Sequence, residues 1–284
     1  MVGKIFADFG AKVFKIEHPT KEDSSKTLGK DQSYYEFLNS NKSVLKLDLN
    51  ASGDRKTFET YLKTSDLVIE GFKEDTKIKL GLTLSHLQFI NPRISLLSIK
   101  GYPPGSSRKD WPGHDLNFQG ASGLIDYLGY GVSMPLAQQF TSQRAAFLAL
   151  STLEHLRLSP YEQGKQIEIN LVDSLRDAFS LQINELKVTG VKSTLFTQYP
   201  ASYRLYRTKD GQITVAAVEV KYWESFLEGI GKLHLIDKQL SKDPKIIGEI
   251  QSVLIDHPTS YWMELFSQNP CCVDQVRGVL DPLD

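Results

Sequence analysis

The sequence predicts an α/β protein in which a parallel sheet is covered by helices on both faces. Short apolar segments rich in β-branched residues, at residues 13–17, 43–49, 66–70 and 93–100, alternate with segments of helical periodicity. Strands separated by helices are typical of parallel sheets, because a crossover between parallel strands leaves room for a helix. Ligands of such sheets bind beyond the carboxyl ends of the strands.

The elements of the first half follow from these local patterns. We expect, in chain order, a helix at 4–12 that ends at Gly10, a strand at 13–17 stopped by His18-Pro19, a polar loop at 21–32, a strand at 43–49, a helix at 54–64, a strand at 66–70, helical turns at 77–80 and 85–89, and a strand at 93–100.

The second half begins with a long apolar helix at 141–158, followed by a hairpin-like lead into a strand at 164–171 and a helix at 173–186. The composition loosens between Gly190 and Tyr199, which predicts a large domain of residues 1–190 and a small domain of residues 191–284. In the small domain an Asp210-Gly211 turn joins strands at 202–208 and 212–218, and helices follow at 222–230, 246–254 and 259–267.

Composition excludes several classes of protein. The net charge is −1 and the basic residues are dispersed, which argues against a nucleic-acid groove. No apolar run approaches the roughly 20 residues that cross a bilayer, and the start of the chain lacks a signal-peptide core, so we expect no membrane partner. The two cysteines, Cys271 and Cys272, are adjacent and provide no disulfide framework, so we expect a cytoplasmic protein. No group of Cys and His residues in the sequence has the spacing of a zinc site, so we expect no metal.

The densest group of chemical signals is the run of residues 111–123. His114 and Asp115 stand side by side after a Pro112-Gly113 turn and before a helical segment. A helix start offers free N–H groups and a partial positive charge, which suit an anion or a developing oxyanion, and histidine exchanges protons near neutral pH. The residues alone leave a plain alternative open, in which His114 caps the turn and Asp115 is an N-cap.

Several separated stretches together resemble the family III CoA-transferases, in particular the α-methylacyl-CoA racemase branch. They are FADFGAKV at 6–13, KIEHP at 15–19, NKSV at 41–44, LDL at 47–49, SDLVIEGF at 65–72, LGL at 80–82, NPR at 91–93, KGY at 100–102, GHD at 113–115, YRTKDG at 206–211, AVE at 217–219 and CV at 272–273. Their order and spacing cover nearly the whole chain.

The resemblance implies a doubly wound large domain, a smaller α+β domain and an interlocked homodimer. It also implies an acyl-CoA substrate and a carboxylic acid as partners. In the racemase branch the residue matching His114 exchanges the α-proton of the thioester, Asp115 adjoins it, and the residue matching Glu219 supports the site. Contacts to coenzyme A are expected from His18, Lys73, Gly101, Gly113 and His114.

Two departures from the family pattern concern the chemistry. Family members carry a catalytic aspartate just ahead of the long helix, where Gln138 or Gln139 stands in this chain, and a glutamine is neither a nucleophile nor a base as a carboxylate is. Lys73-Glu74-Asp75 replaces a usual Arg-Pro-Gly. Two functions therefore stay open: an acyl-CoA enzyme that transfers CoA between carboxylic acids or epimerises α-methylacyl-CoA, and a non-catalytic relative that keeps the fold.

The sequence supports two other expectations. In the family a strand and a glycine turn precede the first helix, and a C-terminal segment returns to the large domain, so we expect a chain shortened at both ends that depends on its dimer partner for stability. Nicotinamide is not expected, because no G-x-G-x-x-G follows a strand, and a serine hydrolase is disfavoured by the lack of a G-x-S-x-G elbow.

Overall fold

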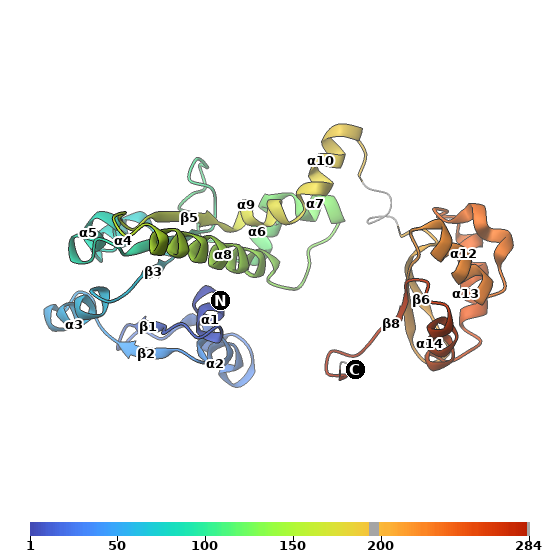
Figure 1. Ribbon diagram of the computed structural model, residues 1–284, viewed down its shortest axis with the longest axis horizontal. Coiled ribbons are helices and arrows are strands. Elements are labelled where there is room, and N and C mark those ends of the chain that lie inside the picture. The colour runs from blue at the N-terminus through green and yellow to red at the C-terminus, as the bar shows by residue number, and fades with distance from the viewer. Residues whose placement is uncertain (193–198, 283–284) are drawn as a thin grey trace. The chain divides into compact units, whose positions relative to one another are not determined.

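The computed structural model describes residues 1–192 and 199–282 (Figure 1). The chain divides into two compact units, Met1–Ser180 and Leu181–Asp284, and each contains its own hydrophobic core. The boundary expected between residues 190 and 199 includes residues 193–198, which lie outside the described residues.

The first unit opens with a parallel pair of strands. Strand β1 (Phe14–Glu17) pairs with β2 (Ser43–Lys46), with Phe14 opposite Ser43. Helix α1 (Val2–Asp8) precedes the pair, and two short 3-10 helices and helix α2 connect its strands: η1 (Ser24–Thr27), η2 (Lys30–Gln32) and α2 (Ser33–Asn39). Both strands and the first helix were predicted. Helix α2 was not predicted, and it buries none of its seven residues.

Three further parallel strands form the second sheet of this unit, in the order β3 (Leu67–Glu70), β4 (Ser95–Lys100), β5 (Gln166–Asn170). The helices of this unit are α3 (Ser52–Leu62), α4 (Glu74–Lys79), α5 (Leu84–Ile90), α6 (Asp115–Ser122), α7 (Leu124–Leu128), α8 (Leu136–Leu158) and α9 (Leu171–Ala178). Helix α10 (Ser180–Thr189) begins at the last residue of this unit and belongs otherwise to the second.

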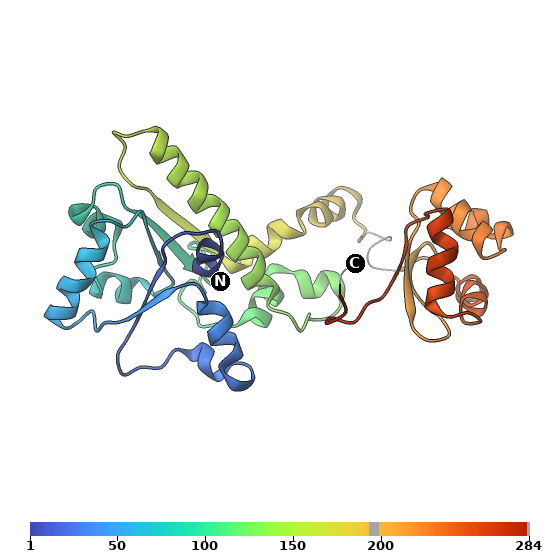
Figure 2. The ribbon, with the colours of Figure 1, turned by 60° about the horizontal axis from the view of Figure 1, so that its bottom comes forward.

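The sheet is covered on both faces, as predicted. Leu96 and Leu97 are neighbours in β4 and point to opposite faces, yet both are fully buried. Leu97 packs in a cluster with Ala145 and Ala149 of α8, and Leu96 packs with Phe58 and Leu62 of α3. Helix α8 is the long green helix of Figure 2. The small alanines let α8 approach the sheet closely.

Two details of the strand arrangement differ from the expectation. The parallel strands form a two-stranded and a three-stranded sheet rather than one ladder, although Ile16 of β1 and Val68 of β3 share a core cluster. Side-chain periodicity identifies a strand and its buried face but not its hydrogen-bonded neighbour. The hairpin-like lead at residues 164–171 is wrong, because β5 runs parallel to β4. Gly164 instead provides a close backbone approach, since a Cβ there would overlap the Ile94 carbonyl.

The second unit is an antiparallel sheet beside helices. Strands β6 (Tyr203–Arg207) and β7 (Gln212–Ala216) form the predicted hairpin, and β8 (Val273–Gln275) adds to β7. Its helices are α12 (Val220–Gly229), η3 (Leu233–Lys238), α13 (Pro244–Leu254) and α14 (Thr259–Gln268). The core centres on Trp223 and Trp262, which are almost fully buried. Strand β8 was missed because three residues are too few to show an alternation.

Within residues 1–192 and 199–282, none of the helices combines the length and the apolar character needed to span a bilayer.

Candidate active site

His114 is the N-cap of helix α6, and its side chain is exposed to solvent. Asn117 fixes its backbone from both directions: the Asn117 Oδ1 accepts from the His114 N–H at 2.9 Å, and the Asn117 N–H donates to the His114 carbonyl at 2.9 Å. This reciprocal cap holds the main chain and leaves the imidazole facing solvent. The ring is therefore open to a ligand rather than packed in the core.

Asp115 has a structural partner in a distant helix. Its Oδ2 accepts from the backbone N–H of Gln138 at 2.8 Å, and its Oδ1 accepts from the N–H of Ala137 at 3.3 Å. These two N–H groups belong to the first turn of α8, which has no intrahelical acceptor for them. Asp115 thus caps α8 and joins the His114 motif to the segment that holds the two glutamines.

Gln119 completes this junction from inside the fold. It is almost fully buried, and its Nε2 donates to the Asp115 Oδ1 at 2.9 Å and to the carbonyl of Val132 at 2.9 Å. Its Oε1 accepts from the Val132 N–H at 2.9 Å. One side chain therefore fixes the loop between α7 and α8 against the motif, and it satisfies polar groups that burial would otherwise penalise.

Gly101 and Gly113 both lie against the Cε1 and Cζ atoms of the Phe118 ring. A Cβ at Gly101 would stand 2.8 Å from the Phe118 ring, and a Cβ at Gly113 would stand 2.9 Å from it. Tyr102 meets the same ring edge-on, with centroids 5.2 Å apart. The two glycines let the end of β4 and the start of the motif close onto Phe118, so they bring the strand end and His114 into one assembly.

Two residues expected to contact CoA, His18 and Lys73, stand at strand ends. His18 follows β1; its Nδ1 accepts from the Thr20 N–H at 3.2 Å, and its Nε2 lies 3.7 Å from Asp48. Lys73 follows β3 and is exposed. Lys100, which the sequence analysis did not single out, ends β4 and bonds the Phe72 carbonyl at 2.5 Å. Its place at the carboxyl end of a central strand was the available signal.

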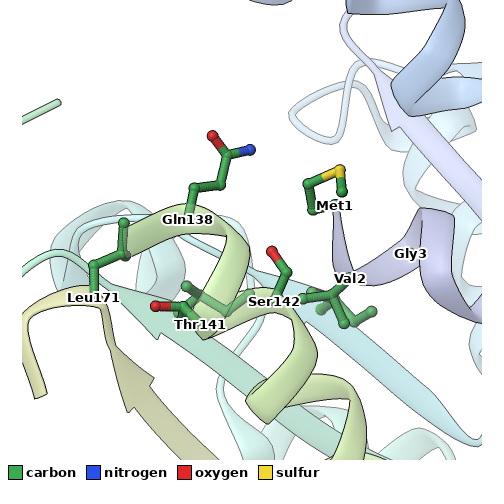
Figure 3. A pocket seen from close by; sticks show the side chains of 9 residues that line it. Met1, Val2, Gly3, Gln138, Thr141, Ser142 and Leu171 are labelled. Atoms are coloured by element: carbon green, nitrogen blue, oxygen red, sulfur yellow. The ribbon is translucent and has the colours of Figure 1, made fainter. Parts of the chain in front are cut away.

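Gln138 lines a pocket of about 240 Å³ at the start of α8 (Figure 3). The pocket is bounded by Met1, Val2, Gly3, Ile69, Ile99, Gln138, Thr141, Ser142 and Leu171. Gln139 is half-buried but does not line the pocket, and His114 does not line it either. Sequence reasoning missed Thr141 and Ser142, because a hydroxyl on an apolar helix gives no distinctive pattern.

Glu219 belongs to the other unit, where it is the exposed N-cap of α12. Its carbonyl accepts from the N–H groups of Tyr222 and Trp223, each at 3.0 Å. Its role in the site stays a prediction from the resemblance.

The cysteines differ in environment. Burial raises the pKa of the Cys271 thiol to about 12, whereas Cys272 is exposed. Among the residues that the structure describes, no three His, Cys, Asp or Glu side chains are grouped so as to hold a metal ion.

The fold and the His114-Asp115 motif indicate a class of protein, and the similarity to known proteins identifies that class. Residues 1–284 match the model of CoA-transferase family III, so the chain belongs to that family. The resemblance drawn from the motifs is confirmed.

The relatives include a protein named as a racemase and a protein named as a CoA-transferase. Human "Alpha-methylacyl-CoA racemase" is 24% identical over 285 residues, which are 96% of this chain and 72% of the relative. The "Succinate--glutarate CoA-transferase" of Agrobacterium fabrum is 28% identical over 234 residues, covering 75% of this chain and 58% of the relative. Among solved structures, Rv3272 of Mycobacterium tuberculosis superposes with a TM-score of 0.81 at 20% identity, covering 98% of this chain and 78% of that one. A CAIB/BAIF family protein of Brucella suis gives 0.82 at 19%, with coverages of 98% and 80%, so the fold is shared.

Proposed function

We propose that this protein binds acyl-CoA thioesters and acts on them, either by transferring CoA between carboxylic acids or by exchanging the α-proton of an α-methylacyl-CoA. Family membership supports the substrate class. The observation that carries the proposal is the exposed His114 at the start of α6, tied through Asp115 to Gln138 at the start of α8.

His114 is the base in this proposal. Removing a proton next to a thioester carbonyl leaves an enolate, whose oxygen needs hydrogen-bond donors or positive charge nearby. The N-terminus of α6 supplies a partial positive charge beside the imidazole. Asp115 is a positioning residue, because its carboxylate is already engaged by the backbone of α8 and by Gln119.

A second candidate function is CoA binding without catalysis, and the glutamine pair favours it. Transfer through an acyl anhydride needs a free carboxylate at the start of α8. The residues there are Gln138 and Gln139, and the carboxylate that reaches them, Asp115, caps the helix instead. A glutamine amide forms no anhydride and accepts no proton at neutral pH. Proton exchange needs a base but no anhydride, so His114 alone keeps that reaction open.

The CoA contacts are part of the proposal. Lys73 is an exposed point charge that suits a phosphate, and His18 stands at the end of the neighbouring parallel pair. The adjoining Glu74 and Asp75 oppose an anion at Lys73. Gly101 and Gly113 keep the backbone close to the Phe118 ring.

We further propose that the large CoA-binding domain comprises residues 1–190, the small domain comprises residues 191–284 and contributes Glu219, and two chains interlock as a homodimer. The chain has a mass of 32.0 kDa, so light scattering distinguishes a monomer from a species of twice that mass. A monomer that stays folded in dilute solution would remove this assembly.

Calorimetry with CoA and acyl-CoAs, combined with deuterium exchange at the α-carbon, tests the proposal. If the natural chain exchanges deuterium at the α-carbon and His114→Ala abolishes this exchange, the racemase-like reaction is supported. Binding with neither exchange nor transfer supports the non-catalytic candidate. Gln138→Asp and Gln139→Asp then ask whether one carboxylate restores transfer. If CoA and every acyl-CoA fail to bind, the proposed function is wrong.

A further inference from the structure

The loop between β3 and α4 carries Lys73, and its backbone is held on both sides of that residue. Phe72 precedes Lys73 and is held through its own backbone groups. Its N–H donates to the Glu70 Oε2 at 2.6 Å, and its carbonyl accepts from the Lys100 Nζ at 2.5 Å. On the other side the Lys73 carbonyl accepts from the Lys77 N–H at 2.9 Å. The Lys73 backbone is therefore fixed, whereas the residue itself is exposed.

Two neighbouring parallel strands provide these contacts to the loop. Gly71 lies against β4, because a Cβ there would stand 3.4 Å from the Ile99 carbonyl. Lys100 follows Ile99 as the last residue of β4, so its ammonium group reaches the loop from the strand that pairs with β3. Phe72 is 43% exposed, so the hydrogen bonds of its backbone are a major part of what holds it. The loop is thus fixed at the edge of the sheet where ligands of this fold bind.

Glu70 and Lys100 also balance each other's charge. Glu70 is 5% exposed, and its Oε1 has no hydrogen-bond partner among the described residues, but this oxygen lies 3.6 Å from the Lys100 Nζ. A buried carboxylate is costly without a cation beside it, so Lys100 compensates Glu70 as well as donating to Phe72. We call Glu70 and Lys100 together the loop clasp.

We propose that the loop clasp positions Lys73 for a phosphate of CoA, so that Glu70 and Lys100 are positioning residues of the CoA site. This inference rests on the proposed function, because it requires that CoA binds. Lys73 is a single point charge without the fork of an arginine, so the position of its backbone limits where a phosphate can meet it. A loop that is already ordered also loses less conformational entropy when the ligand binds.

A double-mutant cycle of Lys100 and Lys73 tests the inference, by calorimetry on the full chain with CoA and isobutyryl-CoA. We expect Lys100→Met to weaken binding about fivefold to tenfold, because Phe72 loses its donor and the loop must then be ordered on binding. Lys73→Met should weaken binding about tenfold through the lost phosphate contact. In the Lys73→Met background, Lys100→Met should change the affinity less than about twofold, since the residue that the clasp positions is gone. Lys100→Arg, which can still donate to the Phe72 carbonyl, should retain most of the affinity.

Urea denaturation of the same variants separates positioning from folding. Lys100→Met leaves the Glu70 carboxylate buried without its cation and should lower the urea midpoint, and adding Glu70→Gln should recover part of the loss. The CoA affinity of this double variant should nevertheless stay about fivefold or more below that of the natural chain, because the Phe72 carbonyl still lacks its donor. Lys63→Met is the matched control: it removes an exposed lysine that precedes β3, and it should alter neither quantity.

An equal loss of affinity on Lys100→Met with and without Lys73 would overturn the inference, because Lys100 would then act independently of Lys73. Unchanged affinity in Lys100→Met, or full affinity in the variant that combines it with Glu70→Gln, would also overturn it. Each of these results leaves the proposed function standing, since the natural chain still binds the ligand. If the natural chain binds neither CoA nor an acyl-CoA, the inference and the proposed function fall together.

Discussion

The Asp115 carboxylate lies 2.8 Å from the backbone nitrogen of Gln138, a residue 23 positions further along the chain, and accepts its hydrogen bond. This contact couples the beginning of α6 to the beginning of α8. It places the residue next to His114 against the first turn of the helix that holds the two glutamines. It also assigns Asp115 to helix capping rather than to proton transfer.

Replacing this cap should cost stability. We expect Asp115→Ala to lower the free energy of unfolding by about 1–2 kcal/mol, because the first N–H groups of α8 lose their acceptor. Urea denaturation measures the change. Asp110→Ala removes an exposed carboxylate from the preceding loop and serves as the control. Equal stability of the two variants would show that the cap contributes nothing.

The packing of Gly113 against Phe118 leads to a second prediction. Gly113→Ala places a methyl group 2.9 Å from the ring and should destabilise the fold by about 1–3 kcal/mol through overpacking. Gly105→Ala is the control, since nothing lies within 4 Å of a Cβ there. Adding Phe118→Leu to Gly113→Ala should recover part of the loss. A double variant less stable than the sum of both single changes would contradict this cause.

The two cysteines should react at very different rates. Because burial raises the pKa of Cys271 to about 12, only about one thiol in ten thousand is a thiolate at pH 8. Cys272 is exposed. A thiol-reactive dye should therefore label one cysteine in the folded chain and two in denaturant. Cys272→Ser should remove the fast reaction; fast labelling that persists in this variant would place Cys271 at the surface.

Acid should weaken the first unit between about pH 4 and pH 2. Partial burial opposes ionisation of Asp23, but hydrogen bonds from the Lys15 side chain and from Ser25 outweigh it and lower the pKa to about 2. A carboxylate with a lowered folded-state pKa stabilises the fold above its unfolded pKa, and this contribution disappears as pH falls through the folded value. With screening by solvent it amounts to about 1 kcal/mol. Thermal melts of Asp23→Asn should show a shallower loss than the natural chain over this range; parallel curves would contradict the assignment.

The sequence was most informative where local pattern determines structure. The apolar runs of β3 and β4 and the apolar face of α8 each follow from periodicity, and so does the Asp210-Gly211 hairpin. Hydrogen-bonded neighbours do not, because β1 and β3 have similar side-chain patterns whether or not they pair. This is why one sheet was expected where the structure has two.

The site was partly predictable for the same reason. The His114-Asp115 pair and the missing carboxylate near Gln138 are visible in the sequence. Capping was also expected as an alternative, but the sequence did not show which helix each residue caps: His114 is the N-cap of α6, and Asp115 caps α8. Hydrogen bonds between residues that are not close in sequence, such as Gln119 and Val132, produce no periodic pattern in the sequence. Neither does an unpartnered hydroxyl such as that of Thr141.

The central claim is that a CoA thioester binds where α6 and α8 begin. Hydrogen–deuterium exchange of the full chain, followed by mass spectrometry with and without isobutyryl-CoA, tests it most directly. We expect slower amide exchange in residues 113–119 and 136–142 on binding, and no change in α13. Unchanged exchange in both segments at a thioester concentration that saturates the chain would contradict it.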